Sequence, residues 1–179
     1  MFAQLKTKGY AGAARNFGID FPIQSEYTWF IDSDDRLASN DVLDKMHKRI
    51  VADKFPDALR CSYAYEMLNK TVPVKTVLNV DAIMHDGGAP FKTCIRSSFR
   101  QHFIEGRARN NDVVWFMKLM DAVDFKRISA IYDICYIYNY YSINSCQNSP
   151  HMKFSKSCID ADRMLVDDLK ALTLNKPQV

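Results

Sequence analysis

The stretch EYTWFIDSDDRLASN, residues 26–40, constrains the fold of this chain more than any other segment. Its aromatic and β-branched run, residues 27–31, is hydrophobic at odd and even positions alike, which predicts a strand buried on both faces. Asp32, Asp34 and Asp35 follow directly, and three carboxylates so close together cost free energy unless a cation or solvent offsets their repulsion. A buried strand that ends in such a turn is typical of an α/β fold, whose chemistry lies just past the carboxyl ends of the strands.

The remaining segments alternate between helical and strand patterns without a strict βαβ order, which also indicates an α/β domain. Asn40 and Asn111 are expected N-caps of the helices that follow them, and Pro73 marks its segment as an edge strand or an excursion. The expected helices are 9–21, 41–54, 99–104, 112–123 and about 152–173, and the expected strands are 27–31, 58–65, 71–80, 91–98 and 127–141.

Composition excludes several classes of protein. The 179 residues suit one domain, and 47% hydrophobic with 25% charged residues indicates a soluble globular chain. The net charge of +3 comes without a clustered basic face, which argues against a nucleic-acid partner. Five widely spaced cysteines without a CxxC pair favour neither a disulfide framework nor a zinc site, so we expect a reducing, cytoplasmic location.

The most apolar stretch, ISAIYDICYIYNYYSI, is too short to span a bilayer and contains Asp133 and Asn139. The sequence leaves peripheral membrane contact open without indicating it.

The acidic turn admits two interpretations. Alternate carboxylates at a strand end, such as Asp32 and Asp34, can converge on Mg²⁺ or Mn²⁺, which prefer oxygen ligands and often share substrate phosphates. The turn can equally be a solvated link between a strand and a helix, with Asp34 or Asp35 as a local cap. The triplet alone does not decide between them.

Several motifs together resemble family 2 glycosyltransferases of the GT-A fold. GYAGAARNFGI followed by EYTWFIDSDDRL is similar to that family's G-x-x-x-A-R-N-x-G helix and D-x-D-D strand end. Further similar segments are GAPFKTCIRSSFRQHFIEG, NNDVVWFMKLM and YIYNYYSINSC, so the likeness covers most of residues 9–146. The resemblance implies one GT-A-like domain over 1–179, a three-layer α/β/α arrangement around a Rossmann-like mixed sheet.

The resemblance also implies roles for particular residues. Asp34 would hold a Mn²⁺ or Mg²⁺ ion on the diphosphate of a nucleotide-sugar, most simply a UDP-sugar, and Asp32 would face the metal or the ribose. Arg15 and Asn16 would lie on the nucleotide side, although Asn16 could equally be a structural cap. His151 is the only candidate by position for the C-terminal histidine that binds metal in some relatives.

Asp112 matches the family's general base, which would take a proton from the acceptor hydroxyl of a glycan or another molecule in an inverting transfer. The family's acidic pair reads Asn111-Asp112 here. Because Asp112 falls in the first turn of its helix, the helix dipole favours its ionised form and makes it a weak base. A residue that only supports the helix start is the alternative.

The family's opening strand-helix-strand segment has no counterpart before residue 9, so the resemblance implies an N-terminally truncated domain. Such a sheet would expose a strand edge, and we expect a second copy or a partner chain to complete it. A GT-A-like binding or assembly module without catalysis is therefore one rival function. A haloacid dehalogenase-like phosphatase is another, because FIDSDD resembles its hhhDxD motif, but no accompanying set of residues supports it.

Overall fold

The computed structural model describes residues 11–21, 25–67, 70–76, 78, 90–106, 111–140, 164 and 167. Of the expected terminal helix, only residues 164 and 167 are described, and both are helical. His151 lies outside the described residues. None of the described helices is long and apolar enough to cross a membrane.

One mixed sheet organises the described part of the chain. Its strands follow the order β1-β5-β3-β6-β2, and β4 pairs with residues 63–67, the C-terminal half of β3. The long central strands β3 and β6 are parallel, whereas the other described pairs are antiparallel. The strand bounds are β1 Tyr27–Thr28, β2 Arg36–Leu37, β3 Ala58–Met67, β4 Lys70–Val74, β5 Thr93–Arg96 and β6 Ile128–Asn139.

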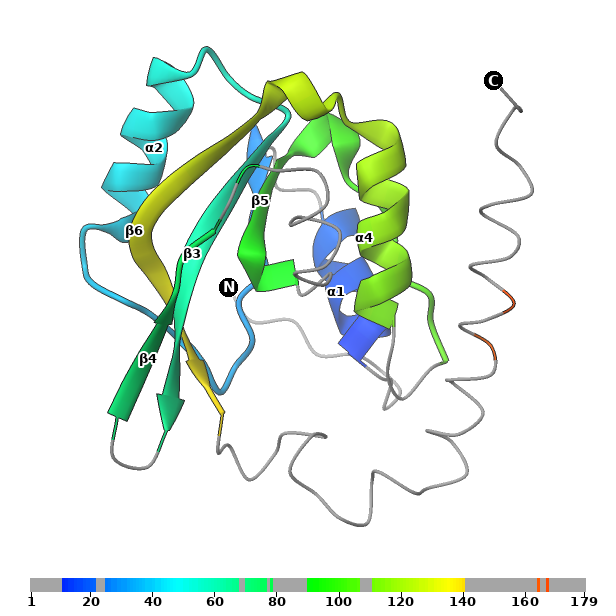
Figure 1. The fold of residues 1–179 in the computed structure, drawn as a ribbon. Coiled ribbons are helices and arrows are strands. Elements are labelled where there is room, and N and C mark those ends of the chain that lie inside the picture. The colour runs from blue at the N-terminus through cyan, green and yellow to red at the C-terminus, as the bar shows by residue number, and fades with distance from the viewer. Residues whose placement is uncertain are drawn as a thin grey trace.

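Helices cover both faces of this sheet. Helix α2 (Val42–Ala52) lies on one side, and α1 (Ala11–Asp20) and α4 (Asn111–Ala122) lie together on the other (Figure 1). The short 3₁₀ turns η1 (Pro90–Lys92), η2 (Ser97–Phe99) and η3 (Phe125–Arg127) connect the elements. The arrangement confirms the expected three-layer α/β/α fold with a mixed sheet.

Each face of the sheet has its own hydrophobic core. On the α2 side, the stripe of Val42, Met46 and Ile50 packs with residues of β3 and β6 such as Leu59 and Cys135. On the α4 side, the core cluster is Ile19, Ala58, Ile95, Phe103, Trp115, Phe116, Leu119, Met120, Val123 and Ile128. Trp115 and Leu119 are fully buried, as the nearly all-apolar pattern of α4 predicts.

The expected strand 27–31 is shorter than predicted, because the chain pairs with β5 only at β1 and then leaves the sheet. Its successive side chains still point to opposite sides of the sheet at positions 29 and 30. Trp29 packs beside Tyr136 with ring centroids 5.9 Å apart, whereas Phe30 contacts Phe103 and Trp115 in the α4-side core. Trp29 and Phe30 are partly buried and Ile31 is 45% exposed, so the prediction of a strand buried on both faces holds only in part.

Neither Asn40 nor Asn111 is an N-cap. The N-cap of α2 is Asp41 rather than Asn40, and Ser39 donates a hydrogen bond to the Asp41 carboxylate 2.5 Å away. Asn111 is the first residue of α4 and is buried. Single polar residues near a helix start locate it only to within a residue or two, since several neighbours can cap equally well.

The expected helix at 99–104 is also wrong. A 3₁₀ turn ends at Phe99, and the following residues run without regular structure along α1 and α4. The sequence FRQHFI suggested a short helix, but side chains of neighbouring helices bind the backbone of this segment instead.

Candidate functional site

The acidic turn lies at the carboxyl ends of the two parallel strands, as expected for an α/β sheet. The amide of Asn139, the last residue of β6, donates to Asp35 at 2.8 Å. Next to the turn, Arg36 donates to Glu66 near the end of β3 at 2.8 Å. The turn is closed by the amide of Asp35, which donates to the carbonyl of Asp32 at 3.1 Å.

Asp35 has a structural task in this turn. One of its carboxylate oxygens accepts from the Tyr136 hydroxyl at 2.5 Å, and the other accepts from the Asn139 amide. The same hydroxyl accepts from the amide of Asp32 at 3.1 Å. Burial raises the pKa of Asp35 above its ordinary value, and these hydrogen bonds act in the opposite direction. Both oxygens of Asp35 are thus occupied by protein donors.

Asp32 faces α1, where the Arg15 guanidinium donates to its carboxylate at 2.7 Å. The Arg15 side chain is only 15% exposed, and its guanidinium lies 5.2 Å above the Phe103 ring. The ring face and the carboxylate together fix the direction of this cation. The structure therefore brings together Arg15 and Asp32, which the sequence assigned to one nucleotide site.

A hollow of about 430 Å³ opens beside this pair. A guanidinium carries five N–H donors, and within the described part of the chain Arg15 gives one side-chain hydrogen bond, to Asp32. Arg15 can therefore serve as a fixed positive group for an anion. The hollow is lined by Ala11, Ala14, Arg15, Gly18, Trp29, Phe30, Ile31, Asp32 and Ser33. Small residues on α1 keep it open.

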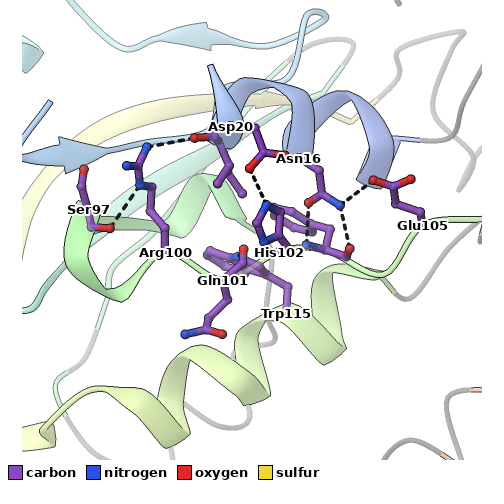
Figure 2. Close-up of polar contacts among 10 residues, drawn as sticks. Asn16, Asp20, Ser97, Arg100, Gln101, His102, Glu105 and Trp115 are labelled. Carbon is purple, nitrogen blue, oxygen red and sulfur yellow. Dashed lines mark hydrogen bonds and ion pairs between the residues drawn. The ribbon is translucent and has the colours of Figure 1, made fainter. Parts of the chain in front are cut away.

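Asn16, the neighbour of Arg15, points the other way and holds α1 against residues 100–105. Its amide nitrogen donates to the Phe103 carbonyl and to Glu105, both at 2.9 Å, and its amide oxygen accepts from the Phe103 amide at 2.7 Å (Figure 2). Asn16 is buried, with a 6% exposed fraction. This placement supports the structural alternative for Asn16, whose polar atoms bind protein groups.

Two further side-chain contacts fix the same segment (Figure 2), and α1 approaches it closely at Gly12. Trp115 of α4 donates to the Gln101 carbonyl at 2.9 Å, and His102 pairs with Asp20 at 2.7 Å. At Gly12 of α1, an added Cβ would lie 2.7 Å from the Ile104 carbonyl oxygen. The absence of a side chain at Gly12 lets the helix approach the segment closely, and this approach sets the position of Arg15.

Asp112 lies in the first turn of α4, close enough to Arg15 and Asp32 for both charges to affect it. Burial raises its pKa, Arg15 acts to lower it, and Asp32 acts to raise it. The expectation of a weak base from the helix dipole is therefore wrong in direction, because loss of solvation is the largest effect at this position. The raised pKa is the direction that suits a general base.

The carboxylates of Asp32 and Asp34 have the right chemistry for a hard divalent cation. No group of three or more His, Cys, Asp or Glu residues is placed to hold an ion within the described part of the chain. Mg²⁺ commonly binds through one or two carboxylates together with substrate phosphates. The residues present thus fit an ion shared with a phosphate ligand and do not form a closed protein cage.

Sequence reasoning missed Tyr136 and the role of Asp35. The aromatic run around Tyr136 was visible, but only the pairing of Leu37 with Tyr136 between β2 and β6 places its hydroxyl under the acidic turn. Sequence reasoning also missed the contact between Phe103 and Arg15, because Phe103 lies far from α1 in sequence.

The fold is a mixed α/β fold of the glycosyltransferase-like kind. No protein-family model and no curated protein matches the sequence. Among solved structures, TarS 1-349 of S. aureus is similar, with a TM-score of 0.67 and 20% identity over 99% of this chain and 49% of that one. A second S. aureus TarS structure has a TM-score of 0.63 and 20% identity over 93% of this chain and 32% of that one.

This chain therefore spans about half the length of one TarS chain and about a third of the other. At this level of identity the likeness shows the fold alone, and it confirms the glycosyltransferase-like fold that the sequence motifs suggested.

Proposed function

We propose that this domain transfers a sugar from a nucleotide-sugar, most simply a UDP-sugar, to the hydroxyl of a glycan or other acceptor. One observation carries the proposal: Arg15 and Asp32 are fixed against each other at the rim of a hollow of about 430 Å³, beside the carboxyl ends of parallel strands. A charged hollow in this position is where open α/β sheets bind phosphorylated ligands.

Each residue has a separate task in the proposed reaction. Arg15 binds the anionic diphosphate, because its guanidinium is fixed over Phe103 and carries donors beyond the one given to Asp32. Asp34 and Asp32 would hold Mn²⁺ or Mg²⁺, which supplies positive charge to the departing diphosphate. His151 remains the proposed third metal ligand.

Asp112 is the proposed general base. The acceptor oxygen bonds to the anomeric carbon as the bond from that carbon to the diphosphate oxygen breaks, and the acceptor proton moves to the Asp112 carboxylate. A single displacement of this kind inverts the anomeric configuration. Burial of Asp112 favours the proton-accepting step, since it raises the pKa of this carboxyl group.

Titration calorimetry with UDP, with and without Mn²⁺, tests the donor site. We expect Mn²⁺ to strengthen UDP binding, and Asp34→Asn to remove at least about tenfold of that gain. Asp44→Asn is the matched control, because Asp44 is an exposed carboxylate in the first turn of α2. UDP binding that is absent at millimolar concentration, or equally strong in both variants, would contradict the proposed donor site.

A transfer assay separates catalysis from binding. If UDP binds but Asp112→Asn leaves the rate of sugar release from a UDP-sugar unchanged, Asp112 is not the base. A chain that binds UDP with Mn²⁺ and releases no sugar from any UDP-sugar would instead be a binding module.

A further inference from the structure

The Tyr136 hydroxyl joins the two ends of the acidic turn. It accepts a hydrogen bond from the Asp32 amide at 3.1 Å and donates one to the Asp35 carboxylate at 2.5 Å. Asp34, the proposed metal ligand, lies between these two attachment points. The hydroxyl thus contacts the first and last carboxylate residues of the turn.

The Tyr136 ring is itself rigidly held. It is fully buried, stacks on the Phe91 ring with centroids 4.5 Å apart and planes within 8°, and contacts Trp29 at 5.9 Å. Trp29 donates to the Phe91 carbonyl at 2.7 Å, so the aromatic neighbours are also joined to each other. Because the ring is buried and packed between aromatic neighbours, its hydroxyl can hold the turn in one position.

The backbone on both sides strengthens this attachment. Leu37 of β2 pairs with Tyr136 itself, and the Ala38 amide donates to the Cys135 carbonyl at 3.0 Å. The Asn139 amide binds the second oxygen of Asp35. Asp35 is therefore tied to β6 at two points three residues apart, and each of its carboxylate oxygens already accepts one hydrogen bond from the protein.

From these contacts we propose that Tyr136 and Asp35 are positioning residues, which hold the turn so that Asp32 and Asp34 face the donor site. Asp35 acts through the backbone of the turn and does not bind the metal. This inference rests on the proposed nucleotide-sugar function, and it divides the three carboxylates of the motif into two that face ligand and one that faces protein.

Tyr136→Phe is the direct test, because it removes one hydroxyl and leaves the ring that stacks on Phe91. Tyr27→Phe is the matched control, because the Tyr27 hydroxyl donates to the Pro56 carbonyl at 2.6 Å and not to a residue of the acidic turn. Each variant removes one tyrosine hydroxyl, which makes two hydrogen bonds in Tyr136 and one in Tyr27. A general loss of folding stability should therefore be at most about twice as large in Tyr136→Phe as in Tyr27→Phe.

Two measurements distinguish positioning from simple stabilisation. Amide hydrogen exchange of residues 31–36 should increase at least about fivefold in Tyr136→Phe and stay unchanged in Tyr27→Phe. The dissociation constant of UDP in the presence of Mn²⁺ should rise about tenfold in Tyr136→Phe, while UDP binding without Mn²⁺ changes less than twofold.

The outcomes are separable. Wild-type chain that binds no UDP with Mn²⁺ overturns the proposed function, and the exchange measurement then still decides whether Tyr136 holds the turn. Wild-type chain that binds UDP, with Tyr136→Phe unchanged in both exchange and affinity, overturns the positioning role alone. Equal losses in Tyr136→Phe and Tyr27→Phe would also overturn it, because they would show a general effect on stability.

Discussion

Replacement of Asn16 by Ala should destabilise the domain more than an ordinary polar substitution. Asn16 supplies both a donor and an acceptor to the backbone of Phe103, and Phe103 is only 3% exposed. The truncation leaves a buried N–H and a buried C=O without their partner. Each such group costs about 1–3 kcal/mol, so we expect a loss of about 2–6 kcal/mol in the free energy of unfolding.

Urea unfolding followed by far-UV circular dichroism measures this loss as a lower midpoint at constant m-value. A chain of this size should also lose about 5–15 °C in melting temperature. Asn40→Ala is the control, because Asn40 is an exposed residue before α2. A loss in Asn16→Ala no larger than that of Asn40→Ala would refute the argument.

The isosteric Asn16→Asp variant sharpens the test. It keeps the acceptor for the Phe103 amide but replaces the donor with an oxygen that faces the Phe103 carbonyl and Glu105. We expect a loss at neutral pH at least as large as that of Asn16→Ala, which shrinks in acid as the new carboxyl group takes up a proton.

Three other substitutions test the packing and the electrostatics of the site by thermal unfolding. Gly12→Ala should lower the free energy of unfolding by about 1–3 kcal/mol, because its Cβ would lie 2.7 Å from a backbone carbonyl oxygen. A Cβ at Gly18 would meet nothing within 4 Å, so Gly18→Ala should raise the free energy of unfolding by up to about 1 kcal/mol through helix propensity. A similar response at both glycines would contradict the close approach of α1. Asp112→Asn should raise the melting temperature at pH 7 and lose this gain in acid. The pKa of Asp112 is higher in the folded chain than in the unfolded chain, where it is about 3.9. The protonated carboxyl group therefore contributes its full stability only below about pH 3.9. This stability is lost as the pH rises through the folded-state pKa. A gain that persists at pH 3 would contradict burial as the cause.

The sequence was sufficient to predict the elements whose hydrophobic residues recur at a regular spacing. The apolar stripe of α2, the buried helix α4 and the strand β3 were all predicted, because each shows its own periodicity. The segment at 99–104 was not, since its backbone partners, Asn16 and Trp115, lie on other elements. Side chains that replace a segment's own hydrogen bonds leave no periodic signal in that segment.

In the candidate site too, the sequence predicted some features and missed those that depend on residues far away in the chain. The motif resemblance singled out Arg15 and Asp32, and the fold brings them to 2.7 Å. The sequence could not distinguish Asp35 from Asp34, because the difference is made by Tyr136, about a hundred residues later in the chain. The burial that raises the pKa of Asp112 likewise depends on packing around α4 and reversed the expectation from the helix dipole.

The most direct test of the donor site is a crystal structure of the chain grown with UDP and Mn²⁺, with manganese located from its anomalous signal. Our account predicts the diphosphate within hydrogen-bond distance of Arg15 and a manganese peak at the Asp34 carboxylate, with Asp35 still bound to Tyr136. Nucleotide bound away from the hollow beside Arg15, or manganese coordinated by Asp35, would contradict it.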